Sequence, residues 1–513
     1  MNENKKFFLT LLISLFAVSL SVFGQYKKFE MRGVWIATVA NIDFPSKQDL
    51  TSTEQQQEFI GILDHLAENN INCIVIQVRP TADALYPSPF EPWSNWLTGQ
   101  QGRSPFPYYD PLYFIINQAH KRCMEVHIWL NPYRVTMNDN INSLSKDHLF
   151  FKNNNIFVKY GTKYYFDPGL DQTREFLNAV VKDLVIRYDV DAIHFDDYFY
   201  PYPEGKSDFP DNQTFADFPR GFKKKADWRR NNVDMIISEL QTTIKSVKPW
   251  VEFGISPFGV WRNKSQDPRG SDTQAGISNY DDLYADILKW LQQGKIDYVV
   301  PQLYWEIGKK NADYRILLKW WAENSFGKNL YIGMYASGLK VNTAPAWKQP
   351  NEIARQLALN KQVKQVDGAM FFSAVPFISN LQGLNDTLQT NYYKFPALNP
   401  INRNMGSKSS PQVQNLTMVK DNRNIILIWN KNNETDGSQA SYYVVYAFKG
   451  KKIGDMNLPE NIIAKTQDNM LNLRNLRNRI QGKYTFVVTA VNRFRIESDA
   501  SKPLSNVQVA NMR

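Results

Sequence analysis

The chain has 513 residues, of which 43% are hydrophobic, 21% charged and 14% aromatic. This composition excludes a mainly disordered chain, because the apolar content is high and the charge content is low. Two Cys residues exclude a disulfide scaffold, and 25 Gly and 26 Pro without a repeat period exclude a collagen-like chain. The net charge of +10 is spread over 60 basic and 50 acidic residues, without a basic block that would indicate a nucleic-acid partner.

The N-terminus has the pattern of a secretion signal. Lys5 and Lys6 precede an apolar segment over residues 7–20, which is short for a membrane span, and the small residue Gly24 follows it. We therefore predict a signal peptide over residues 1–24 and export to the periplasm or the medium, and an uncleaved anchor is the alternative. In an oxidising compartment, Cys73 and Cys123 either pair or remain two buried thiols.

Strand-like and helix-like segments alternate through the long middle part of the chain. The expected strands are 31–39, 71–79, 124–131, 190–197, 251–256, 296–304, 329–335 and 367–373. The expected helices are 53–70, 110–122, 171–188, 223–247, 278–293, 311–325 and 350–364. Eight strands that alternate with helices predict an α/β fold, a (β/α)8 TIM barrel over residues 28–395.

The chain changes character after the predicted barrel. Residues 396–411 are rich in Pro, Asn, Ser and Gly and are predicted to form a linker. Residues 412–513 contain short strand-like segments without helices, which is typical of a small all-β immunoglobulin-like sandwich. Trp429 in the second of these segments and Tyr484 at the start of a later one resemble a fibronectin type III module. We expect this module to be a spacer or a docking element.

Active sites of (β/α)8 barrels lie at the carboxyl ends of the strands, and those ends are rich in polar and aromatic residues in this chain. Because side chains alternate along a strand, His194 and Asp196 are expected to point into the barrel, with Asp197 at the strand end. The candidates for binding substrate around this mouth are Arg79, Asp83, His127, Trp129, Asn131, Tyr133, Arg134, His194, Tyr198, Trp261, Gln302, Tyr304 and Trp305.

Carboxyl groups at this mouth point to glycoside hydrolysis. Such enzymes usually place two carboxyl groups across the bond, one that gives a proton to the leaving oxygen and one that is ionised. Asp196, Asp197 and Glu306 are the candidate catalytic residues. We expect no metal and no cofactor, because zinc-site, nucleotide-binding and nucleophile-elbow motifs are absent from the sequence. A divalent ion at Asp196 and Asp197 is the alternative.

Three stretches of the sequence resemble one bacterial family. They are MRGVWIATV at residues 31–39, DAIHFDDYFYP at residues 191–201 and VPQLYW at residues 300–305. Together they resemble the glycosyl-hydrolase-like family ten, a family of (β/α)8 proteins, over about residues 28–390. The resemblance implies a secreted or envelope glycoside hydrolase, and some similar proteins are thought to cleave peptidoglycan glycan strands stripped of their stem peptides.

The family motif places its acidic pair on Asp196 and Asp197. Asp196 would orient the sugar or act as nucleophile or base, and Asp197 or Glu306 would donate the proton. If the family requires no acid at Glu306, the alternatives are a 2-acetamido group of the substrate as nucleophile, with Asp197 as acid, or a loop acid such as Asp83 or Glu91. We therefore expect an exported hydrolase of an N-acetylhexosamine-containing polysaccharide such as stripped peptidoglycan. Association of the protein with the cell envelope is part of this expectation. A hydrolase of dietary or capsular polysaccharide and a non-catalytic glycan-binding barrel are the alternatives.

Overall fold

The computed structural model of the chain describes residues 26–348, 351–403, 405, 408–421, 424–432, 434–476 and 480–509. The signal peptide predicted over residues 1–24 lies outside these described residues. Within them, no helix has both the length and the apolar character needed to cross a membrane.

Eight parallel strands close into a barrel, as the sequence predicts. The strands are β1 (Met31–Ile36), β2 (Cys73–Arg79), β3 (Glu125–Leu130), β6 (Ala192–Phe195), β7 (Glu252–Ile255), β8 (Tyr298–Val299), β9 (Asn329–Met334) and β10 (Val366–Phe371). Each strand pairs with the strands before and after it in the barrel sequence, and β1 closes the ring on β10. The carboxyl ends of all eight strands therefore meet at one mouth.

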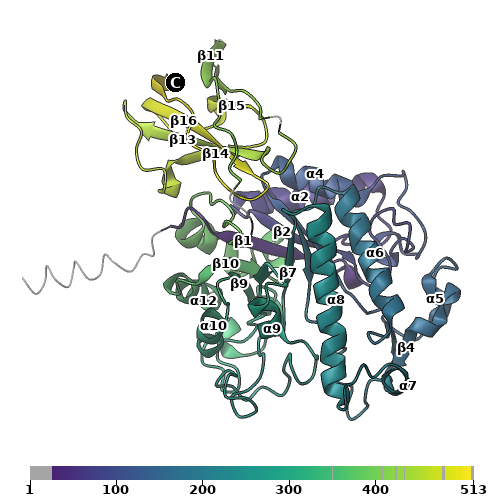
Figure 1. Cartoon of the computed structure of the whole chain (residues 1–513). Helices are drawn as coiled ribbons and strands as arrows, with labels where there is room; N and C mark the ends of the chain where they lie inside the picture. The colour runs from purple at the N-terminus through teal and green to yellow at the C-terminus, as the bar shows by residue number, and fades with distance from the viewer. Residues whose placement is uncertain are drawn as a thin grey trace, which may run out of the picture.

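Helices cover the outside of the barrel (Figure 1). They are α2 (Ser52–Glu68), α4 (Pro111–Lys121), α6 (Asp171–Arg187), α8 (Lys225–Val247), α9 (Ile287–Gln292), α10 (Tyr314–Glu323) and α12 (Asn351–Gln362). The helix expected over 278–293 is shorter in the structure. The residues before α9 are not helical and instead make hydrogen bonds with the start of the loop that follows β7. Asn279 Nδ2 donates to the carbonyl oxygens of Phe258 and Val260.

Shorter elements occupy the loops between strands and helices. They are α3 (Asn95–Thr98), α5 (Leu149–Lys152), the hairpin of β4 (Phe157–Tyr160) and β5 (Lys163–Phe166), α7 (Asn212–Asp217), α11 (Gly338–Val341), α13 (Val375–Ile378) and α14 (Leu384–Thr387). Four of the loops that follow barrel strands are long, namely those after β2, β3, β6 and β7. The loop after β2 carries α3, the loop after β3 carries α5 and the hairpin, and the loop after β6 carries α7. Long loops at the carboxyl ends of barrel strands are where substrate sites are usually built.

The barrel interior is filled with side chains. The Tyr298 hydroxyl lies 2.8 Å from His127 Nδ1 and 3.0 Å from His194 Nδ1, and His194 Nε2 lies 2.9 Å from Ser256 Oγ. Both histidines are fully buried, so they form a hydrogen-bonded layer inside the barrel rather than part of an open mouth. Cys73 also lies in this interior, and it is a free thiol.

The C-terminal region is all-β, as the sequence predicts. One sheet pairs β11 (Thr417–Asp421), β12 (Asn424–Ile428) and β15 (Met470–Asn472), and the other pairs β14 (Ile462–Thr466), β13 (Ala440–Lys449), β16 (Gly482–Asn492) and β17 (Leu504–Val509). All pairs are antiparallel, and Trp429 packs in the core between apolar strand residues. The fibronectin type III type of this region stays a prediction.

The C-terminal sheets lie at the amino end of the barrel, whereas α5 and α7 lie at the opposite end (Figure 1). Cys123, a buried free thiol, packs there with Tyr442 of β13. Arg495, in the turn after β16, contacts Glu125 and Glu252 at 2.5 Å each. These two glutamates are the first residues of β3 and β7, so the C-terminal region closes the end of the barrel that is remote from the mouth.

Candidate active site

An acidic pair stands where β6 ends. Asp196 and Asp197 directly follow the last strand residue, and each is only 4% exposed. The indole N–H of Trp129, on the neighbouring strand β3, donates to Asp196 Oδ2 at 2.8 Å, and the backbone N–H of Tyr198 donates to Asp196 Oδ1 at 3.1 Å. These two donors fix the orientation of the Asp196 carboxyl group.

Different donors hold the second member of the pair. The Tyr202 hydroxyl donates to Asp197 Oδ2, and Gln302 Nε2 donates to Asp197 Oδ1 at 3.1 Å. Gln302 follows β8, and the same amide group donates to the carbonyl oxygen of Ser256 at 2.8 Å. Residues from three barrel segments therefore position the Asp197 carboxyl group.

Burial raises the pKa of both carboxyl groups. The pKa of Asp196 is raised to about 7, first by burial and then by the charge of Asp197. Burial also raises the pKa of Asp197, although the hydrogen bonds from Tyr202 and Gln302 act in the opposite direction. Because two close carboxyl groups resist double ionisation, the pair keeps one proton near neutral pH. It can then supply a proton donor and a carboxylate together.

The pair opens into a cavity of about 260 Å³, which we call the acidic pocket. Its lining residues are Trp35, Ala37, Val39, Ile42, Gln77, Trp129, Arg134, Asp196, Asp197, Tyr198, Ser256, Gln302, Tyr304, Tyr335 and Phe372. The rings of Tyr304 and Tyr335 stack with centroids 4.9 Å apart. The pocket thus combines two acids, one arginine and several aromatic faces, which is a suitable lining for a sugar.

A smaller cavity of about 150 Å³ adjoins the acidic pocket and shares Arg134 and Tyr198 with it. The Arg134 guanidinium lies over the Tyr198 ring, 5.3 Å from its centroid. Asn131 also lines this cavity, and its Oδ1 accepts a hydrogen bond from the backbone N–H of Arg134 at 2.9 Å. Arg134 Nη2 is buried and has no hydrogen-bond partner among the described residues. Arg134 is thus a cation shared by the linings of both cavities.

The structure brings several predicted residues together and places others elsewhere. Those that line the two cavities are Trp129, Asn131, Arg134, Asp196, Asp197, Tyr198, Gln302 and Tyr304. Arg79 is outside both, in a buried ion pair with Glu91 at 2.5 Å. Asp83 is buried in the loop after β2, where it accepts a hydrogen bond from Gln101 at 3.4 Å.

Glu306 is not at the acidic pocket. Its carboxyl group accepts a hydrogen bond from Trp347 Nε1 at 3.2 Å and lies 3.2 Å from Lys309. The expectation that it shares a mouth with Asp196 extended the strand alternation through residue 306. Strand β8 ends at Val299, so the alternation no longer fixes the direction of that side chain.

Three aromatic candidates belong to the packing outside the acidic pocket. Trp261 is buried against Trp320, with parallel rings 6.1 Å apart. Trp305 packs edge-on against Phe258 at 5.3 Å. Tyr133 is fully buried in the main core. All three follow strands in the sequence, but none of them lines the acidic pocket or the smaller cavity.

Other lining residues were missing from the predicted set. Tyr202 lies in the aromatic run directly after the acidic pair, and Trp35 lies in the first family motif. Tyr335 and Phe372 each follow the last residue of a barrel strand, β9 and β10. The rule that sites form at carboxyl strand ends therefore contained the signal for these last two residues.

One group of possible metal ligands lies at the other end of the barrel. Cys73, Glu125 and His127 have ligand atoms within 4.8 Å of one another. The Arg495 guanidinium already occupies the Glu125 carboxylate, with contacts of 2.5 and 2.6 Å. We therefore interpret this group as part of a buried ion-pair cluster.

The chain is similar to solved structures and to curated proteins. Among the structures, the glycoside hydrolase domain of PgaB (BpsB) from Bordetella bronchiseptica aligns with a TM-score of 0.49 and 12% identity, over 71% of this chain and 99% of that one. Among the proteins, glycosyl hydrolase DigH of Escherichia coli (strain K12) is 40% identical over 371 residues, which are 68% of this chain and 84% of DigH.

A second relative extends along almost the whole chain. Glycosyl hydrolase YngK of Bacillus subtilis (strain 168) is 41% identical over 504 residues, which are 97% of this chain and 98% of YngK. Residues 30–352, which contain the acidic pair, match the family model described as glycosyl hydrolase-like 10. The chain therefore belongs to the glycosyl hydrolase-like 10 family and is a glycoside hydrolase.

Proposed function

We propose that this glycoside hydrolase is exported and cleaves an N-acetylhexosamine-containing polymer, namely peptidoglycan glycan strands that lack stem peptides. The distribution of acids in the acidic pocket carries the proposal. Asp196 and Asp197 leave the same strand end, and the acidic pocket contains no third carboxyl group among the described residues. Glu204, which lines the smaller cavity, also follows β6, so no carboxyl group in the described lining of either cavity comes from another barrel strand.

Such a pocket favours a nucleophile that comes from the substrate. Glycosidases that rely on two carboxyl groups place them on opposite sides of the scissile bond, whereas substrate-assisted enzymes use a 2-acetamido group of the sugar. Its carbonyl oxygen attacks the anomeric carbon while the acidic pair gives its proton to the leaving oxygen. The remaining carboxylate can hold the acetamido N–H, and water then opens the cyclic intermediate while its proton returns to the pair.

Arg134 supports the choice of stripped strands. Arg134 lines both cavities, and its buried Nη2 has no hydrogen-bond partner among the described residues. Muramic acid carries a lactyl carboxylate, which is free only when the stem peptide has been removed. A guanidinium binds such a carboxylate through charge-assisted hydrogen bonds. Intact strands would present an amide at this position and a bulky peptide beside it.

The test is release of soluble fragments. Purified residues 25–513 and the Asp197→Asn variant would be incubated with intact and with amidase-stripped peptidoglycan, and products would be separated by chromatography and identified by mass spectrometry. We expect oligosaccharides from stripped strands only, and none from the variant. A folded wild-type protein that releases nothing from either polymer would contradict the substrate assignment. Fragments from capsular or dietary polysaccharides would then support the second hydrolase hypothesis.

An Arg134→Met variant tests the recognition of the lactyl carboxylate. We expect kcat/KM on stripped strands to fall by roughly 10-fold or more, because a charge-assisted hydrogen bond is lost. The value of kcat/KM on oligomers of N-acetylglucosamine, which lack the carboxylate, should fall much less. Arg315→Met is the matched control, since Arg315 is exposed and pairs with Asp313 outside both cavities. An equal fall in kcat/KM on both substrates would show that Arg134 does not recognise the lactyl carboxylate.

A further inference from the structure

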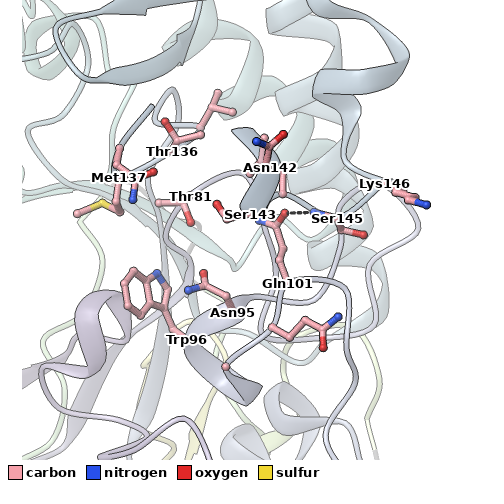
Figure 2. A pocket seen from close by; sticks show the side chains of 15 residues that line it. Thr81, Asn95, Trp96, Gln101, Thr136, Met137, Asn142, Ser143, Ser145 and Lys146 are labelled. Carbon is pink, nitrogen blue, oxygen red and sulfur yellow. Dashed lines mark hydrogen bonds between the residues drawn. The ribbon is translucent and has the colours of Figure 1, made fainter. Parts of the chain in front are cut away.

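A larger hollow of about 730 Å³ lies among the loops after β2 and β3, and we call it the distal pocket (Figure 2). Its lining residues are Thr81, Asn95, Trp96, Gly99, Gln100, Gln101, Val135, Thr136, Met137, Asn138, Asn142, Ser143, Leu144, Ser145 and Lys146. Nothing in the acidic chemistry described above uses these residues. Its volume lies within the usual range for small-molecule sites, roughly 300 to 1,000 Å³.

The buried side-chain amide of Gln101 connects the two loops that form the distal pocket. The Gln101 side chain is 8% exposed, and its amide oxygen accepts the backbone N–H of Ser145 at 2.9 Å, as the dashed line in Figure 2 shows. Its amide nitrogen donates to Asp83 Oδ2 at 3.4 Å. Gln101 therefore joins the loop after β3 to a buried acid in the loop after β2. The two loops that form the hollow are therefore connected by a buried side chain.

The distal pocket adjoins the acidic pocket along the chain. Arg134 lines the acidic pocket, and the residues that directly follow it, Val135 to Met137, line the distal pocket. Two residues of chain span at most about 7 Å. Arg134 Nε also donates to the carbonyl oxygen of Pro80 at 3.2 Å, and the next residue, Thr81, lines the distal pocket too. The two pockets are therefore close neighbours in the fold.

The chemistry of the lining suits a sugar. Hydroxyl and amide groups predominate, and the fifteen lining residues include no carboxyl group and one cation, Lys146. Trp96 and Asn95 come from α3 and lie side by side in the wall (Figure 2). An indole face packs against the C–H groups of a sugar ring, and neutral side chains exchange hydrogen bonds with hydroxyl and acetamido groups.

We propose that the distal pocket is a subsite for a sugar unit of the same glycan chain, remote from the bond that is cleaved. This inference rests on the proposed function and adds that the enzyme acts on oligomeric chains long enough to fill both pockets. Binding energy gained at a remote subsite lowers the barrier for the reacting unit only when the chain reaches it. The rate must therefore depend on chain length.

Stripped glycan strands separated by length provide the test. We expect kcat/KM to be higher for long than for short strands, and Trp96→Ala to reduce only the long-strand value, by roughly five- to ten-fold. Asn142→Trp fills the hollow from an exposed position and should give the same pattern without removing a packed ring. Phe106→Ala is the matched control, since Phe106 is 85% exposed and outside the lining. Binding would be measured by calorimetry in an Asp197→Asn background, where strands stay intact.

The outcomes separate this inference from the proposed function. Cleavage without dependence on length, or with equal long-strand rates in wild type, Trp96→Ala and Asn142→Trp, would overturn the subsite and leave the function standing. Strands that are bound in a length-dependent and Trp96-dependent way but never cleaved would support the subsite and overturn the function. Strands that are neither bound nor cleaved would overturn both.

Discussion

Replacing Asp196 with Asn is expected to lower hydrolysis by about 100- to 10,000-fold and to stabilise the fold at alkaline pH. The loss of activity follows because the acidic pair would no longer share a proton near neutral pH, and acid catalysis by a positioned group contributes roughly 100- to 10,000-fold. The gain in stability follows because ionisation of a carboxyl group that is 4% exposed is unfavourable in the folded state. Activity and stability therefore make opposite demands on this residue.

The sign of the stability effect follows from the pKa of Asp196. Its pKa is raised to about 7 in the folded protein, against about 3.9 for an unperturbed Asp in the unfolded chain. Below about pH 4 both states are protonated, and the carboxyl group adds no penalty. As the pH rises from about 4 through 7, the unfolded state ionises first, and wild type loses up to about 4 kcal/mol of unfolding free energy that the variant keeps.

Denaturant unfolding at a series of pH values would measure this difference. The unfolding free energy of Asp196→Asn minus that of wild type should grow between about pH 4 and 7 and then level off. Asp217→Asn is the matched control, because Asp217 is an exposed residue at the end of α7 and its replacement should leave the wild-type pH dependence intact. If the unfolding free energies of wild type and Asp196→Asn depended on pH in the same way, burial would not raise the pKa of Asp196.

The sequence predicted the parts of the site that the strands themselves orient. Asp196 is one residue beyond β6, and Trp129 lies within β3, so the alternation of side chains still fixed their directions. The hydrogen bond between them confirms that both point to the same mouth. Apolar strands at regular spacing likewise predicted all eight barrel strands.

Residues beyond the strand ends could not be placed in this way. Glu306 and Trp261 follow β8 and β7 by several residues, and contacts with Trp347 and Trp320 decide their directions. Those partners are 41 and 59 positions away in the chain, as the residue numbers show, and no local pattern encodes such contacts. The same reason hid the distal pocket, whose two walls are loops joined by Gln101.

The role of the C-terminal region was also beyond local patterns. Arg495 contacts Glu125 across 370 positions of the chain and Glu252 across 243. Both glutamates begin barrel strands, and Glu125 is hydrogen-bonded onward to His127 at 3.1 Å. The sequence predicted a spacer or a docking element, whereas these contacts make the region part of the barrel's buried polar network.

Replacing Arg495 with Met is therefore expected to destabilise the folded chain by about 3–5 kcal/mol. That is the usual cost of removing one partner from a buried ion pair, because Glu125 and Glu252 would stay buried without a counter-charge. The side chain of Arg495 is only 6% exposed, so water cannot replace the guanidinium. Thermal and denaturant unfolding of the full chain would measure the effect.

Two further variants separate a buried counter-charge from a general effect of losing an arginine. Arg403 pairs with Asp367 but is 45% exposed, and Arg403→Met should cost less than about 1 kcal/mol. Adding Glu252→Gln to Arg495→Met should recover part of the lost stability, since one of the two uncompensated charges is then removed. An Arg495→Met variant as stable as Arg403→Met would mean that the C-terminal region is only an appended spacer. A large loss that Glu252→Gln partly reverses would mean that the barrel depends on this region for the charge balance of its closed end.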